Sequence, residues 1–263
     1  MILVNDVDDP DSANWYVDGI LEQQPYRFLL DTGATFTTIL SDDYLSTFTP
    51  IGTRDSAGVF SSTKNDLIVL PNLKIGSFSA KDVTIARAPK NKLGIKNILG
   101  MSFFKDKALH FLFDVGEVQI LNKNKIPEQL TLFDLFMGEN FHPYLDISWQ
   151  GNTFAKGVWD TGAGVTVFDS KFIKKHPQFF KLAGNSEGTD STGAKKETPI
   201  YEMKDFVLGG KQFPVTKVVA IDLSVPNSII KTPMDFILGY PILRKANWFF
   251  DFPQRKWGIS KII

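Results

Sequence analysis

The feature that most constrains the fold is a string of four residues, Asp-Thr-Gly-Ala, that occurs twice in the chain of 263 residues. It begins at Asp31 and again at Asp160, 129 positions later, and each copy follows an apolar run. The preceding segments, 15–34 and 144–163, align without a gap, and the pattern of each predicts two strands joined by a polar turn. This repeat predicts two structurally equivalent halves.

Three further blocks recur downstream in the same order in both halves. The corresponding blocks are GTRDSAG (52–58) and GTDSTG (188–193), NILGMSFFK (97–105) and FILGYPILR (236–244), and FLFDVGEVQIL (111–121) and WFFDFPQRKWGI (248–259). From the first string to the apolar-Leu-Gly blocks, the offset between the halves drifts only from 129 to 139 positions. Such conserved order and spacing indicate an internal duplication rather than coincidence.

Most of the chain between these blocks has the pattern of β-strands. Short alternating apolar runs separated by Gly, Ser and Asn fill segments such as 63–88 and 197–222. Helical patterns are brief: one covers 170–184, and short turns follow Gly100 and Gly239. We therefore expect an all-β protein with few short helices.

The paired Asp-Thr-Gly strings, each followed by an apolar-Leu-Gly block, resemble those of the aspartic peptidases of the pepsin and retropepsin type. The resemblance covers nearly the whole chain, because both strings and both blocks lie in register. It implies a bilobal pepsin-like acid protease fold with two pseudo-symmetric, β-barrel-like lobes. We expect the N-terminal lobe at 1–125, a connector at 126–139 and the C-terminal lobe at 140–263.

The chemistry of such a site explains why the string occurs twice. Hydrolysis of a peptide without a metal ion or a strong nucleophile needs a base that activates water and an acid that protonates the carbonyl oxygen. Two carboxyl groups about 3 Å apart cannot both ionise, so such a pair shares one proton. The ionised group can serve as the base and the protonated group as the acid, as in this family generally. The resemblance therefore implies that Asp31 and Asp160 are catalytic and that no cofactor or metal ion is needed. Cysteine is absent and no HExxH motif occurs, so zinc-peptidase chemistry has no support.

The residues that follow each aspartate have supporting roles that the resemblance implies. Thr32 and Thr161 are expected to hydrogen-bond across the two loops and lock them together. Gly33 and Gly162 are expected to let backbone amides approach the carboxylates closely, which a Cβ would hinder.

Ala34 and Ala163 occupy a position where many pepsin-like enzymes carry Ser or Thr. Alanine cannot donate a hydrogen bond to the charged carboxylate, which should leave the apparent pKa values of the pair higher. In this respect the site resembles retropepsins, and we expect a mildly rather than strongly acidic pH optimum. The blocks that end at Gly100 and Gly239 are expected to pass behind the loops and support them.

Two hairpins with glycine at the tip are candidates for flaps that close over a bound peptide. The candidate flap residues are Ser56, Ala57, Gly58, Ser191, Thr192 and Gly193. Neither tip carries the tyrosine that pepsins use, so with two flaps the enzyme would be closer to a fused retropepsin dimer. The alternative is that both are surface hairpins without catalytic importance.

Three other patterns have structural interpretations. Residues 184–188 match the G-x-S-x-G pattern of serine hydrolases but lack the flanking strand and helix, and we predict a loop there. Four aspartates between positions 6 and 11 lack the spacing of a calcium loop and predict a solvated N-terminal tail. Residues 130–136 are expected to pack between the halves.

Composition limits the partners and the location. The numbers of Lys+Arg and Asp+Glu are equal, at 29 each, and no basic run occurs, so we expect no nucleic-acid partner. No stretch approaches the roughly 20 apolar residues of a membrane helix. We expect a monomer that binds an extended peptide or protein substrate. The first 14 residues do not resemble a signal peptide, so the cytoplasm is the default expectation, with the periplasm or secretion open if a leader was removed.

Two alternatives to a general aspartic endopeptidase stay open on the sequence. A peptide-binding module with the same fold but without hydrolysis is favoured slightly by the missing flap tyrosine and opposed by both intact Asp-Thr-Gly loops. A self-processing or scaffold protein whose only substrate is itself or one partner has no distinguishing sequence feature.

Overall fold

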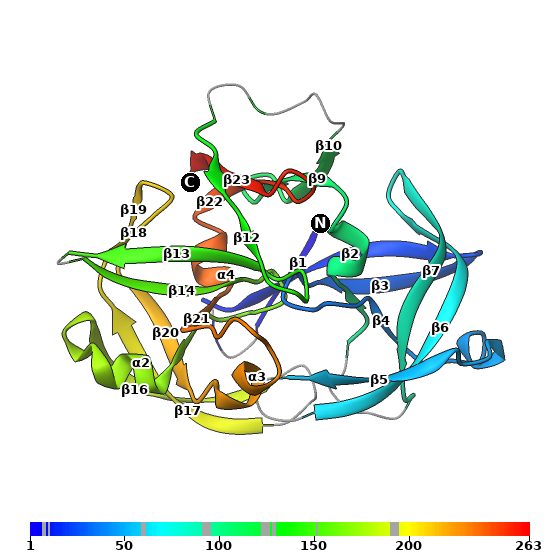
Figure 1. The fold of residues 1–263 in the computed structure, drawn as a ribbon, viewed down its shortest axis with the longest axis horizontal. Coiled ribbons are helices and arrows are strands. Elements are labelled where there is room, and N and C mark those ends of the chain that lie inside the picture. Colours follow the sequence, from blue (N-terminus) through cyan, green and yellow to red (C-terminus); the bar gives the residue numbers. More distant parts are fainter. Residues whose placement is uncertain are drawn as a thin grey trace.

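A computed structural model of the chain describes residues 1–6, 9, 11–58, 62–90, 96–121, 127, 130–150, 152–189 and 195–263. Within these ranges the structure consists mainly of β-strands with few short helices, which confirms the expected fold class (Figure 1). A ten-stranded sheet lies on one side of the molecule and an eight-stranded sheet on the other, with a five-stranded sheet between them.

The eight-stranded sheet is built from the first hundred residues. Its strands are β1 (Ile2–Asn5), β2 (Ala13–Leu21), β3 (Gln24–Leu30), β4 (Thr38–Leu40), β5 (Gly52–Ala57), β6 (Ser62–Ile75), β7 (Phe78–Ala88) and β8 (Ile98–Leu99). Their order is β1-β2-β3-β8-β4-β7-β6-β5, so β5 lies at an edge.

The ten-stranded sheet is built from the second half. Its strands are β12 (Phe136–Met137), β13 (Pro143–Trp149), β14 (Thr153–Trp159), β15 (Val167–Asp169), β16 (Phe180–Thr189), β17 (Lys195–Met203), β18 (Phe206–Leu208), β19 (Lys211–Phe213), β20 (Thr216–Ile221) and β21 (Phe236–Leu238). Their order is β16-β17-β20-β15-β21-β14-β13-β18-β19, and β12 pairs with β13.

The five-stranded sheet combines strands from the first half, from the segment that follows it and from the end of the second half. These strands are β9 (Ala108–Leu112), β10 (Glu117–Leu121), β11 (Phe133–Asp134), β22 (Ala246–Asp251) and β23 (Lys256–Ile262), in the order β10-β9-β22-β23-β11. The helices are α1 (Met101–Phe104), α2 (Ser170–Lys175), α3 (Ser224–Ser228) and α4 (Tyr240–Leu243), with 3-10 turns at Leu45–Thr47 and Pro177–Phe179. In the described ranges no helix is long and apolar enough to cross a membrane.

The two large sheets share one strand order. From the β2–β3 hairpin the first sheet continues as β3-β8-β4-β7-β6-β5, and from the β13–β14 hairpin the second continues as β14-β21-β15-β20-β17-β16. The pairs β3–β8 and β14–β21 are both parallel, as are β4–β7 and β15–β20. The recurring sequence blocks therefore occupy equivalent strands. The expected lobe boundaries at 1–125, 126–139 and 140–263 stay a prediction.

Aromatic side chains from both halves fill the space between the sheets. The ring centroid of Trp159 lies 4.8 Å from that of Phe111 and 4.6 Å from that of Phe250. All three side chains are fully buried. Since Phe111 belongs to β9 and Phe250 to β22, the cluster ties the central sheet to the end of β14. Residue 159 directly precedes Asp160, so this packing also fixes the backbone at the second Asp-Thr-Gly loop.

Two expectations for the segment 170–188 are wrong. The α-helix ends at Lys175, a 3-10 turn beginning at Pro177 follows, and from Phe180 the chain is strand β16. The G-x-S-x-G string therefore lies within a strand rather than in a loop. The Phe180 ring packs against Trp149 with the ring centroids 6.0 Å apart, and this burial selects the strand over continued helix.

The expected solvated N-terminal tail is also wrong. Residues 2–5 form β1 and pair with β2. The Asp11 carboxylate accepts hydrogen bonds from Arg244 at 3.1 Å and from Lys217 at 3.2 Å, and so links the first residues to the second half. Positions 7, 8 and 10 lie outside the described residues. Spacing along the chain could not reveal ion pairs between residues more than 200 positions apart.

The segment 130–136 packs only partly as expected. Leu135 is buried, and the Phe133 ring packs against Trp257 with the centroids 5.2 Å apart. Phe136 is 44% exposed and belongs to β12, which extends the ten-stranded sheet, whereas β11 extends the central one. The segment therefore adds short strands to two sheets instead of lying wholly between the halves.

Truncation of Phe111 to alanine tests the central aromatic cluster. We expect Phe111→Ala to lower the free energy of unfolding by about 3–5 kcal/mol, because it leaves a cavity against Trp159 and Phe250. Urea unfolding followed by tryptophan fluorescence measures the change. Phe154→Ala, at a side chain that is 63% exposed, is the matched control and should change stability by no more than about 0.5 kcal/mol. Equal losses in the two variants would contradict the packing described.

Candidate active site

Each aspartate of the repeated string stands at the end of a strand. Asp31 follows β3 and its backbone N–H donates to the Leu99 carbonyl at 3.1 Å. Asp160 follows β14 and its N–H donates to the Leu238 carbonyl at 3.0 Å. The short parallel strands β8 and β21 thus fix the backbone of both aspartates in the same way.

The glycine after each of these short strands allows the chain to pass close behind a loop. A Cβ at Gly100 would lie 2.6 Å from the Phe36 carbonyl oxygen, and a Cβ at Gly239 would lie 2.1 Å from the Val165 carbonyl oxygen. Real Cβ atoms do not approach backbone so closely, so a residue other than glycine would push the loop away.

The loop alanines accept hydrogen bonds from the helix that follows each glycine. The N–H of Met101 donates to the Ala34 carbonyl at 2.8 Å, and the N–H of Tyr240 donates to the Ala163 carbonyl at 2.9 Å. These are the contacts behind the loops that the repeated blocks predict.

The two loops are hydrogen-bonded to each other through their threonines. The Thr32 N–H donates to Thr161 Oγ1 at 3.1 Å, and the Thr161 N–H donates to Thr32 Oγ1 at 3.1 Å. The Thr32 hydroxyl donates in turn to the Trp159 carbonyl at 2.8 Å. Both threonines are buried, so the bonds are shielded from water and couple the halves at this point.

The loop glycines bring the carboxyl groups close to the opposite loop. The N–H of Gly33 and the N–H of Gly162 both donate to Asp160 Oδ1, at 3.0 Å and 2.8 Å. A Cβ at Gly33 would lie 2.3 Å from Asp160 Oδ2, and a Cβ at Gly162 would lie 2.3 Å from Asp31 Cγ. Only glycine at these positions leaves room for one carboxyl group from each half.

Burial and proximity make the two carboxyl groups share a proton. Burial raises the pKa of Asp31 well above its usual range, and the charge of Asp160 and a hydrogen bond between the carboxyl groups raise it further. Burial also raises the pKa of Asp160, while hydrogen bonds from Gly162, Asp31 and Gly33 act in the opposite direction. Both pKa values are therefore raised, and the pair titrates as one unit. Such a pair offers one acid and one base at the same place.

This arrangement agrees with the match to known proteins. The family model described as "Aspartyl protease" matches residues 17–103, which include the first loop and the block behind it. The whole chain has the fold of the crystallised aspartic proteinase from Irpex lacteus, with a TM-score of 0.61 over 95% of this chain and 94% of that one, at 15% sequence identity. No curated protein matches this chain significantly by sequence.

Two buried threonines behind the two Asp-Thr-Gly loops were missed in the sequence. The N–H of Gly100 donates to Thr37 Oγ1 at 3.3 Å, and the N–H of Gly239 donates to Thr166 Oγ1 at 3.1 Å. Both side chains are fully buried. A pattern in the sequence points to these threonines, because each stands six positions after its aspartate.

The structure describes only part of the candidate flaps. Residues 56–58 lie at the end of β5 and beyond it, and Ser56 Oγ accepts a hydrogen bond of 3.1 Å from Asn65 Nδ2. Residues 191–193 lie outside the described residues. In Figure 1, β5 and β17 reach the lower middle of the view from opposite sides. That these hairpins act as flaps stays a prediction.

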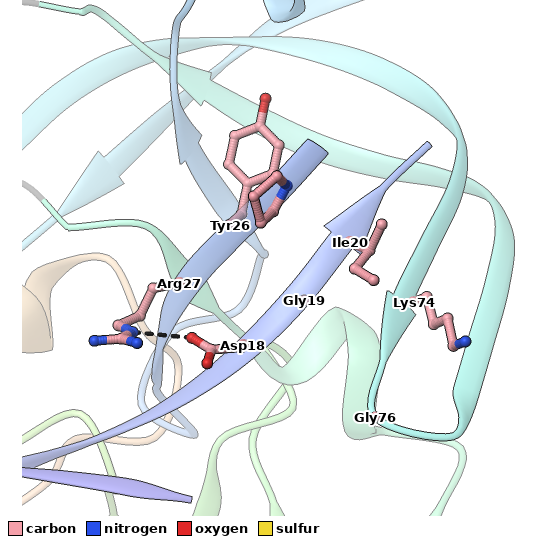
Figure 2. A pocket seen from close by; sticks show the side chains of 8 residues that line it. Asp18, Gly19, Ile20, Tyr26, Arg27, Lys74 and Gly76 are labelled. Atoms are coloured by element: carbon pink, nitrogen blue, oxygen red, sulfur yellow. Dashed lines mark hydrogen bonds and ion pairs between the residues drawn. The ribbon is translucent and has the colours of Figure 1, made fainter. Parts of the chain in front are cut away.

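A surface depression of the N-terminal sheet lies apart from the paired aspartates (Figure 2). It lies between the β2–β3 hairpin and the end of β6, and an ion pair of 2.9 Å between Asp18 and Arg27 borders it. Ile20 and Lys74 line the remainder, and neither aspartate of the repeated strings contributes. The depression therefore takes no part in the site.

The hydroxyl of Thr32 can be removed with little change of shape. We expect Thr32→Val to lower the free energy of unfolding by about 1–3 kcal/mol for each buried group left unpaired, namely the Thr161 N–H and the Trp159 carbonyl. Thr32→Ser keeps the hydroxyl and should lose much less. Urea unfolding compares the two variants, and equal losses would show that the hydroxyl contributes little.

The raised pKa values of the pair predict a pH dependence of stability. Between the usual carboxyl value of about 4 in the unfolded chain and the raised folded pKa, the folded protein binds more protons, so the free energy of unfolding falls as pH rises. Asparagine cannot ionise, so Asp31→Asn should become progressively more stable than the wild type as pH rises above about 4. Asp18→Asn is the control and should follow the wild type. A wild-type-to-variant difference that is constant with pH would contradict the shared proton.

Proposed function

We propose that this protein is an aspartic endopeptidase that hydrolyses peptide bonds in extended peptide or protein substrates. The observation that carries the proposal is the pair Asp31 and Asp160, one carboxyl group from each half, brought together by the two loops and each with a raised pKa. The aspartyl protease family match of residues 17–103 supports it. We further propose that the chain arose by internal duplication and acts as a monomer, because one chain supplies both loops.

The protonation of the pair suggests how the reaction proceeds. The Asp160 carboxylate takes a proton from a water molecule, whose oxygen attacks the peptide carbonyl carbon, while protonated Asp31 donates its proton to the carbonyl oxygen. The product of this step is a tetrahedral diol. The proton now on Asp160 then passes to the leaving nitrogen, the C–N bond breaks, and Asp31 recovers a proton from a diol hydroxyl. Each carboxyl group thus alternates as acid and base, without a cofactor or a metal ion.

Edge strands on both sides support binding of an extended substrate. β5 is the outer strand of one sheet and β16 is the outer strand of the other, and each pairs with a neighbour on one side only within the described residues. An edge strand offers backbone N–H and carbonyl groups to an added peptide strand. We propose that Ser56–Gly58, and residues 191–193, which follow β16 in the sequence, close over the peptide.

A peptide-binding module without hydrolysis is the second candidate. The observation that favours it is the absence of tyrosine from both hairpin tips. The peptidase and the binding module would both bind a statine-type mimic of the diol. Binding of the mimic must therefore be measured together with peptide cleavage to distinguish them. Binding of the mimic with no cleavage of any peptide would favour the module.

Replacement of each aspartate tests the proposal. Asp31→Asn and Asp160→Asn should each lower kcat/KM on an unbiased peptide library by at least about 10²–10⁴-fold, because each removes one partner of the acid–base pair. Rates at several pH values also show whether the optimum is mildly acidic. Asp18→Asn, which removes an exposed carboxylate elsewhere, should cleave like the wild type. If both loop variants cleave like the wild type, the mechanism is wrong.

A further inference from the structure

One arginine lies beside the first catalytic loop and on the edge strand that borders it. Arg54 belongs to β5, four residues before Gly58. Its guanidinium carbon lies 4.0 Å from the ring centroid of Phe36, which stands five positions after Asp31. Both Arg54 and Phe36 are partly exposed, so the ring holds the cation at a surface that solvent and ligands can reach.

The Arg54 charge has no acidic partner among the residues that the structure describes. Burial lowers the pKa of its guanidinium, and no neighbouring carboxylate offsets that effect within the described ranges. Arg87 on β7 provides the contrast, because it donates to Asp66 Oδ2 at 2.7 Å and to the Leu45 carbonyl at 2.8 Å. Within the described residues, the guanidinium of Arg54 therefore has hydrogen-bond donors available for a ligand, whereas that of Arg87 already donates to Asp66 and Leu45.

The surroundings of Arg54 are polar but carry no compensating negative charge. His142 Nε2 lies 3.4 Å from Thr35 Oγ1 in the catalytic loop, and burial together with the positive charge of Arg54 lowers the pKa of His142 to about 4. Asn65 lies directly opposite Arg54 across β5–β6 and is buried, and its Oδ1 has no hydrogen-bond partner among the described residues. This face of the hairpin thus has unused hydrogen-bonding capacity next to a positive potential.

The second half of the chain lacks this arrangement. The block GTRDSAG of the first half corresponds to GTDSTG in the second, which is one residue shorter and has no arginine. Val165 occupies the position that corresponds to Phe36. The pair of Arg54 and Phe36 is therefore a feature of the first half, with no sequence counterpart in the second.

We propose that Arg54 is a specificity-determining residue that selects substrates with a Glu or Asp side chain on one side of the cleaved bond. The substrate carboxylate accepts two hydrogen bonds from the guanidinium, which the Phe36 ring holds in a fixed plane. The inference rests on the proposed function, because it assigns a substrate class to the same site. It also gives the bound peptide a direction, since the pair of Arg54 and Phe36 has no sequence counterpart in the other half.

Matched peptides test the selection on the unmodified protein. Peptides that differ only by Glu or Gln at one position are compared, and the position is moved along both sides of the cleaved bond. We expect kcat/KM to be about tenfold higher with Glu at one position on one side only, which corresponds to about 1.4 kcal/mol. The preference should fade below about pH 4, where the Glu side chain becomes protonated. Equal rates for Glu and Gln at every position would overturn the proposal.

Charge variants assign the preference to Arg54. Arg54→Gln should abolish the Glu preference, so that the ratio of kcat/KM for the Glu and Gln peptides falls to about one, and Arg54→Glu should favour a Lys peptide, because like charges repel and opposite charges attract. Lys74→Gln, which removes a cation at the far end of β6 (Figure 2), is the matched control and should keep the Glu preference. A Glu preference that persists in Arg54→Gln would overturn the assignment.

A binding measurement separates this inference from the proposed hydrolysis. Fluorescence anisotropy gives the affinity of the Asp160→Asn protein, with and without Arg54→Gln, for the same labelled Glu and Gln peptides. Tighter binding of the Glu peptide that depends on Arg54 supports the inference even if no peptide is hydrolysed. Equal binding of the two peptides overturns it, whatever the outcome for catalysis.

Discussion

Two carboxyl groups held close enough to share a proton are the constraint on which the rest of the structure depends. Neither half can supply both, so each half must present its aspartate at the end of a strand and bring it to the other. Glycine at positions 33 and 162 leaves the space, and the reciprocal bonds between Thr32 and Thr161 fix the spacing. The short strands β8 and β21 pair in parallel with β3 and β14, and so fix the backbone that leads into each aspartate.

Burying ionisable groups in this way destabilises the fold at a pH where they would otherwise be charged. The surrounding structure offsets that cost by apolar packing. The aromatic rings around Trp159 come from the central sheet and lie directly below the second loop. A cluster of buried aromatic rings thus stands next to the second aspartate, where it stabilises the backbone that presents the carboxyl group.

The sequence predicted the fold class, the repeated hairpins and the two loops, because these depend on short motifs whose spacing recurs. It failed where tertiary contacts decide between local alternatives. The Phe-rich run after Pro177 fits a helix or a strand equally well, and only the contact of Phe180 with Trp149 selects the strand. The ion pairs of Asp11 with the second half depend on the finished fold. Thr37 and Thr166 are different, because each stands six positions after an aspartate and this equal spacing is readable in the sequence.

The residues immediately before the two aspartates show what joining both halves in one chain permits. Leu30 precedes Asp31 and Trp159 precedes Asp160, and both are buried at equivalent strand ends. In a dimer of identical subunits, the two positions would have to carry the same side chain, and a gain in volume at one would be doubled at the axis. On a single chain the two positions can carry different side chains, so a bulky ring at one position can be combined with a smaller aliphatic group at the other. The symmetry of the backbone therefore does not restrict the two sides of the site to the same amino acids.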